Sequence, residues 1–145
     1  MSSRLNPLAA YGKVANAQTD PLQQIIMLYD GAIKFLRLAA ADMMVGDLIA
    51  KAEHTNRAFD IITYLQSILD FERGGDVARA LDLFYTSLML QILNASAALD
   101  SGKMEQAAEL LQPVRDAWAA QVPAHPPAFA VAGQPSFAGS HQLIA

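Results

Sequence analysis

The chain has 145 residues, a length expected of one domain, and its net charge is −4, with basic residues that occur singly. A nucleic-acid backbone is therefore excluded as a partner, because phosphate recognition needs clustered lysines and arginines. The absence of cysteine excludes a disulfide framework and a thiolate metal site. Charged residues make up 17% and hydrophobic residues 53%, and this shortage of charge predicts apolar surface as well as an apolar core.

The first segment, residues 1–19, is predicted to be an irregular N-terminal arm. Asn6-Pro7 and Gly12 interrupt any helix, and the arm carries two isolated apolar residues, Tyr11 and Val14. It lacks the apolar core of a signal peptide, so we expect a cytoplasmic protein. We predict a helical domain over residues 20–121 and a separate tail after it.

Two long helices are predicted next. Asp20-Pro21 is a helix start signal, and the helix that follows runs to about Val45 with two apolar stripes. Gly46-Asp47 ends it and caps a second helix, Leu48 to about Phe71. The predicted core stripe of the second helix contains Ile49, Ala52, Phe59, Ile62, Leu65, Ile68 and Leu69.

A third helix is predicted from about Asp76 to Leu99, after a stop at Gly74-Gly75. Its run from Leu83 to Leu99 has no charged residue and carries two apolar stripes. A helix with one buried face needs only one such stripe. The run is slightly short for a membrane span and is interrupted by five polar residues, so no membrane insertion is expected.

A fourth helix is predicted from about Lys103 to Ala120. Pro113 lies inside it and predicts a kink or break near Leu110. Because the connections between all four helices are short, neighbouring helices should be antiparallel. The predicted fold class is therefore all-α, an antiparallel four-helix bundle with an irregular N-terminal arm and a disordered C-terminal tail.

The tail, residues 122–145, is rich in proline and alanine and has no charged residue apart from two histidines. Such a segment cannot form a packed core and is predicted to be disordered. It is either a solvated tail without a specific role or a recognition segment whose apolar contacts are Phe129, Phe137 and Leu143-Ile144.

No constellation for catalysis, metal binding or phosphate binding is found, so we expect neither an enzyme nor a cofactor. His54 is the one candidate for chemistry. It lies on the polar side of the second helix, followed by Arg57 and Ala58, and is loosely similar to the acceptor of a histidine phosphotransfer module. A solvated surface histidine is the simpler interpretation.

The first and third helices both have two apolar stripes, whereas a bundle needs one from each. Exposed apolar patches indicate partner sites, and the usual partner would be an amphipathic helix lying in a groove between two bundle helices. Homodimerisation through the same stripes is an equal alternative on these residues alone.

Several segments in order resemble one family. They begin with Tyr11-Gly12-Lys13-Val14 and Asp20-Pro21, followed by Met27–Ile33 with the sequence MLYDGAI. They continue through Ala58, Ile61-Ile62, Leu65, Leu69-Asp70, Glu72, Gly74-Gly75, Leu81, Tyr85, Leu93, Ala95, Asp100, Leu110-Leu111, Arg115 and Ala117-Trp118. Together they resemble the flagellin export chaperones of the FliS family over about residues 9–120. Leu90 and Gln91 stand where basic residues are usual, and the tail is not explained.

The resemblance implies a non-enzymatic cytoplasmic chaperone. Members bind the disordered C-terminal segment of flagellin, expected here one-to-one, prevent premature polymerisation and deliver subunits to the type III export machinery. Export-gate components and other flagellar regulators are further candidate partners.

The partner site implied by the resemblance is an apolar groove that the N-terminal arm covers until flagellin displaces it. We predict that Tyr11 and Val14 cover this groove. The apolar pattern does not separate groove residues from core residues, and the predicted set is Ile25, Leu28, Tyr29, Ala32, Ile33, Ile62, Leu65, Leu69, Leu83, Leu90 and Leu93.

Overall fold

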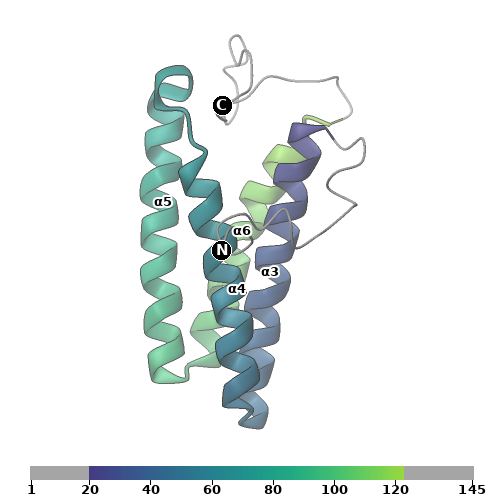
Figure 1. The fold of residues 1–145 in the computed structure, drawn as a ribbon, viewed down its shortest axis with the longest axis vertical. Coiled ribbons are helices and arrows are strands. Elements are labelled where there is room, and N and C mark those ends of the chain that lie inside the picture. Colours follow the sequence, from purple (N-terminus) through teal and green to yellow (C-terminus); the bar gives the residue numbers. More distant parts are fainter. Residues whose placement is uncertain (1–19, 123–145) are drawn as a thin grey trace, which may run out of the picture.

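The structure, a computed structural model, describes residues 20–122, and every regular element in this range is an α-helix (Figure 1). The helices are, in chain order, α3 (Pro21–Val45), α4 (Leu48–Ser67), α5 (Phe71–Ala98) and α6 (Ser101–Ala119). The predicted all-α four-helix bundle is confirmed. The predicted arm, residues 1–19, and the tail from residue 123 onward lie outside the described residues, and the division into three segments stays a prediction.

Each of the four helices begins after an aspartate. Its carboxylate accepts a hydrogen bond from a backbone N–H in the first turn, which satisfies a donor that has no partner within the helix. The negative charge also lies favourably at the positive end of the helix dipole. The four pairs are Asp20 with Gln23 at 2.8 Å, Asp47 with Ala50 at 3.1 Å, Asp70 with Arg73 at 3.0 Å, and Asp100 with Lys103 at 3.0 Å.

The connection between α4 and α5 differs from the sequence prediction. The expected stop at Gly74-Gly75 was wrong, because α4 already ends at Ser67 and Asp70 caps a helix that starts at Phe71. Gly75 has φ 52° and ψ −129°, a conformation that glycine adopts without a steric cost. The glycine pair therefore marks a kink within the first turns of α5, and the aspartate cap decides where the helix begins.

Of the kink or break predicted near Leu110, the structure contradicts the break, because Pro113 lies inside a continuous α6. The helix continues from Ser101 to Ala119 with Pro113 inside it. The proline ring removes the N–H that would bond the carbonyl of Glu109. Both Pro113 and Glu109 are exposed residues, so water can satisfy that carbonyl and the helix is retained.

The helices differ in how closely they pack. α3 packs extensively against both α4 and α6, whereas α5 contacts α4 and α6 less closely and stands at one side of the bundle (Figure 1). Both apolar stripes of α3 are therefore buried, and the expectation that its second stripe forms apolar surface was wrong. On α5, by contrast, one stripe is buried and the other faces outward.

Polar side chains link α4 to α5 at two levels. Near one end, the Lys51 ammonium donates to the hydroxyl of Ser96 at 3.0 Å and to its backbone carbonyl at 3.3 Å. Nearer the other end, the Gln66 amide donates to the Asp82 carboxylate and to the Thr86 hydroxyl, each at 2.9 Å. These bonds fix the register of α5, whose apolar packing is the less extensive.

Candidate functional site

The structure divides the predicted site residues into three groups. Seven are buried in the bundle core: Ile25, Leu28, Tyr29, Ala32, Ile33, Ile62 and Leu65. Leu69 is half-buried at the α4–α5 connection, and Leu83, Leu90 and Leu93 are exposed on α5. Tyr11 and Val14, predicted to cover the groove, lie outside the described residues.

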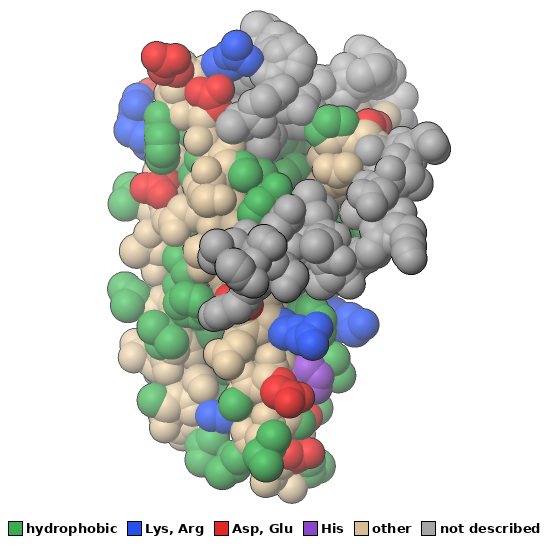
Figure 2. All heavy atoms as spheres, viewed as in Figure 1, with side chains coloured by type: hydrophobic (Ala, Val, Ile, Leu, Met, Phe, Trp, Pro, Cys, Tyr) green, Lys and Arg blue, Asp and Glu red, His purple; other side chains and the backbone are tan. Residues whose placement is uncertain are grey.

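The outward face of α5 is apolar over several turns. Leu83 is 70% exposed, Leu90 57% and Leu93 49%, and spacings of seven and three residues place them on one side of the helix. No charged residue occurs between Asp82 and Asp100. Figure 2 shows hydrophobic side chains along the middle and lower part of α5, with charged side chains mainly at its upper end. We call Leu83, Leu90 and Leu93 the leucine face.

An apolar groove lies between α5 and α6. Its volume is about 410 Å³, within the range of roughly 300–1,000 Å³ that is usual for ligand pockets. α5 contributes Val77, Ala80, Leu81 and Phe84, and α6 contributes Pro113, Val114 and Ala117. Sequence reasoning treated Pro113 only as a helix breaker and missed this groove, although Phe84 belongs to the apolar run from Leu83 to Leu99.

A second apolar area lies at the end of the bundle where α3 and α4 meet. Met44, Val45 and Ile49 are each at least 75% exposed, and Leu48 is 50% exposed. Ile49 was predicted to face the core, and that was wrong, because the α3–α4 turn extends beyond the α5–α6 turn (Figure 1). The side chains of Leu48 and Ile49 at the start of α4 therefore stay exposed.

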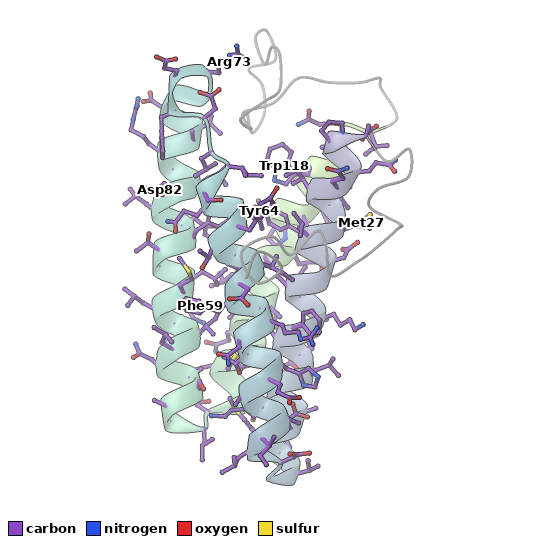
Figure 3. All side chains as sticks on the ribbon, viewed as in Figure 1. Met27, Phe59, Tyr64, Arg73, Asp82 and Trp118 are labelled. Atoms are coloured by element: carbon purple, nitrogen blue, oxygen red, sulfur yellow. The ribbon has the colours of Figure 1, made fainter. Side chains whose placement is uncertain are left out.

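Two tyrosines join α3 to α5 inside the bundle. The hydroxyls of Tyr29 and Tyr85 are 2.5 Å apart and hydrogen-bonded, and both side chains are at most 2% exposed. The Trp118 side chain of α6 is also buried, and Figure 3 places it on the upper part of α6, beside α3. The two tyrosine hydroxyls satisfy each other inside an apolar core, so the pair is a specific link between α3 and α5.

The tyrosine pair predicts a loss of stability at high pH. Burial raises the pKa of Tyr29 from 10.0 to about 12 and raises the pKa of Tyr85 well above 10.0. The folded state therefore retains these protons more strongly than the unfolded chain, and this contribution is fully present below pH 10 and lost as the pH rises towards 12.

We expect the free energy of unfolding, measured by urea denaturation, to fall over that pH interval. A variant with Tyr29→Phe and Tyr85→Phe is the control and should lose less stability over the same interval. Equal losses in the two proteins would contradict this assignment.

His54 has structural partners. Its Nδ1 lies 2.7 Å from an Asp42 carboxylate oxygen, which links α4 to α3, and its ring stacks on Phe35 with centroids 5.9 Å apart. The guanidinium of Arg57 covers the same Phe35 ring at 5.8 Å. These contacts give His54 a structural role, because they link α4 to α3.

Residues 20–122 contain neither a metal site nor a membrane-spanning helix. No group of three or more His, Cys, Asp or Glu side chains in this range could hold a metal ion. Among the same residues, no helix has the length and hydropathy needed to cross a membrane. The apolar surfaces of α5 and α6 are thus the features of the described chain that a function must explain.

The family model and the related proteins that match this chain point to the same family. The family model described as "Flagellar protein FliS" matches residues 4–125. The flagellar secretion chaperone FliS of Vibrio cholerae is 34% identical over 115 residues, which cover 77% of this chain and 85% of that protein. Its counterpart from Salmonella typhimurium is 34% identical over 116 residues (77% and 86%), and that from Bacillus subtilis is 28% identical over 113 residues (78% and 84%). This chain therefore belongs to the FliS family of flagellar proteins.

Proposed function

We propose that this chain is a flagellar export chaperone that binds the C-terminal segment of flagellin in the cytoplasm. The observation that carries the proposal is the leucine face of α5, an exposed apolar surface without charge. Surfaces of this kind on a small domain are partner sites. Relatives named flagellar secretion chaperones support a substrate of flagellar export as the partner.

The leucine face suits a partner that becomes helical when it binds. Leu83, Leu90 and Leu93 lie along two to three turns of α5, so an amphipathic helix placed beside α5 can bury its own apolar stripe against them. The groove between α5 and α6 extends this surface, because Ala80 lines the groove one turn before Leu83. Burial of this apolar area offsets the entropy lost when a disordered segment is ordered.

The proposed mechanism is binding and contains no catalytic step. A flagellin segment held on the leucine face is unavailable for filament packing, so the complex prevents polymerisation before export. We propose one flagellin for each chaperone, because the leucine face is a single surface on one helix. Export-gate components are candidate partners of the loaded complex.

Leu90→Asp tests the proposed partner surface. We expect it to weaken binding of a flagellin C-terminal peptide by roughly tenfold to a hundredfold, because burying a leucine contributes about 1.5–3 kcal/mol. Isothermal titration calorimetry measures the affinity, and circular dichroism checks the helix content. Leu48→Asp is the matched control, since Leu48 has a similar exposure, 50%, and lies on α4, outside the leucine face.

Equal peptide affinities for Leu90→Asp, Leu48→Asp and the parent chain would contradict the proposal that the leucine face binds the partner. Light scattering with and without the peptide separates the proposal from homodimerisation through the same leucines. A dimer that persists when saturated with peptide would assign the leucine face to self-association.

Deletion of residues 1–18 tests the proposed cover over the site. If Tyr11 and Val14 compete with the partner, their removal should tighten peptide binding and leave the helix content unchanged, because a competing bound state lowers the apparent affinity. The same calorimetric titration measures the change, with Tyr11→Ser in the full chain as the control for loss of a single contact. Unchanged affinity in both proteins would rule out the cover.

A further inference from the structure

The groove between α5 and α6 lies close to the point where the described chain ends. Its α6 residues, Pro113, Val114 and Ala117, precede Val122 by five to nine residues. At 1.5 Å per helical residue, this corresponds to about 7–13 Å. A segment that continues from Val122 therefore starts within about two turns of an open apolar groove.

The chain after Val122 has the composition of a ligand for such a groove. Residues 123–145 contain two phenylalanines, Phe129 and Phe137, and no charged side chain apart from histidines 125 and 141. Four prolines in this segment, at positions 123, 126, 127 and 135, favour extended polyproline conformations, which leaves less entropy to lose on docking. The family match ends at residue 125, so both phenylalanines lie beyond it.

The geometry allows the first phenylalanine to reach the groove. Phe129 lies seven residues after Val122, and a polyproline segment spans about 3.1 Å per residue, so its reach is about 22 Å. This exceeds the roughly 7–13 Å along α6 from Val122 to the lining residues. The tether is covalent and short, so the local concentration of the tail at the groove is in the millimolar range.

We propose that residues 123–145 bind the groove between α5 and α6 of their own chain through Phe129 and Phe137. The lining is apolar on both helices, and Phe84 offers an aromatic ring to the incoming phenylalanine. A tail docked there covers the surface next to the leucine face, so an external partner that extends into the groove competes with it. Docking of the tail involves this chain alone, whatever the identity of the external partner.

Spin labels on the full chain test this proposal. Because the chain has no cysteine, single cysteines can be labelled selectively. Arg79→Cys places a label beside the groove, next to Ala80, and Lys34→Cys places one on α3, next to Phe35, whose ring contacts α4. The expected result is loss of the amide NMR signals around Phe129 and Phe137 with the label at residue 79, and their retention with the label at residue 34.

A second variant tests whether the two phenylalanines cause the signal losses. Phe129→Ser combined with Phe137→Ser should restore the tail signals in the chain labelled at residue 79, and both substitutions leave the sequence of the four helices unchanged. Retained signals with both labels, equal losses with both labels, or losses that persist in the double variant would each overturn the proposal. Mixing isotope-labelled chains with spin-labelled chains detects docking between two copies, and losses arising only in that mixture would overturn docking within one chain.

Discussion

Leu28→Ala is expected to lower the free energy of unfolding by about 2–5 kcal/mol, which is the usual cost of removing a fully buried leucine. Leu28 is 0% exposed on α3, the helix that packs closely against both α4 and α6. The neighbouring helices therefore cannot easily move inward to fill the cavity that the leucine side chain leaves. Chemical denaturation followed by far-ultraviolet circular dichroism measures this loss.

Leu90→Ala is the matched control for Leu28→Ala. The same atoms are removed from a side chain that is 57% exposed on the leucine face, so the free energy of unfolding should change by about 0.5 kcal/mol or less. Peptide binding should nevertheless weaken. Comparable losses of stability in the two variants would show that α5 packs inward through the leucine face, contrary to the proposed site.

Tyr85→Ala is expected to be at least as damaging, with a loss of about 3–5 kcal/mol. The change removes a buried ring that lies 6.5 Å from the Tyr29 ring and 5.8 Å from the Phe84 ring, measured between centroids. It also removes the hydrogen-bond partner of a buried hydroxyl on α3. Because α5 has the less extensive packing, we expect this variant to loosen α5 before the rest of the bundle.

The phenylalanine variants separate the hydroxyl contribution from the ring contribution. Tyr85→Phe alone should cost about 1–3 kcal/mol, because the Tyr29 hydroxyl loses its Tyr85 partner. The combined Tyr29→Phe and Tyr85→Phe variant should be more stable than the sum of the two single losses predicts. Each single variant leaves one buried hydroxyl without its tyrosine partner, whereas the double variant leaves none. Strictly additive losses in denaturation experiments would contradict a coupled pair.

The core and the proposed binding surface use different faces of α5. One side of α5 contributes Leu81, Tyr85, Leu88 and Ile92 to the core, and the other side carries the leucine face. The polar bonds from Lys51 and Gln66 hold α5 in place from α4. These bonds oppose a rotation of α5 about its axis that would exchange its buried and exposed apolar stripes.

Local signals in the sequence were sufficient to predict the four helices and most of the residues at which they begin and end. Asp20-Pro21 and Gly46-Asp47 predicted the start of α3 and the α3–α4 turn as the structure has them. The start of α5 was misplaced, because two glycines suggested a stop whereas the Asp70 cap begins the helix earlier. Pro113 misled in a similar way, since its cost depends on whether water reaches the carbonyl that it leaves free.

What the sequence by itself determined is the fold class, the family and the excess of apolar residues, because periodicity, caps and motifs are local properties of the chain. The structure decided which apolar stripe is surface. α3 and α5 both have two stripes, but α3 lies closely between two neighbours and buries both, whereas α5 stands at one side and buries one. Burial depends on which helices become neighbours, and that is settled by tertiary packing and not by spacing along one helix.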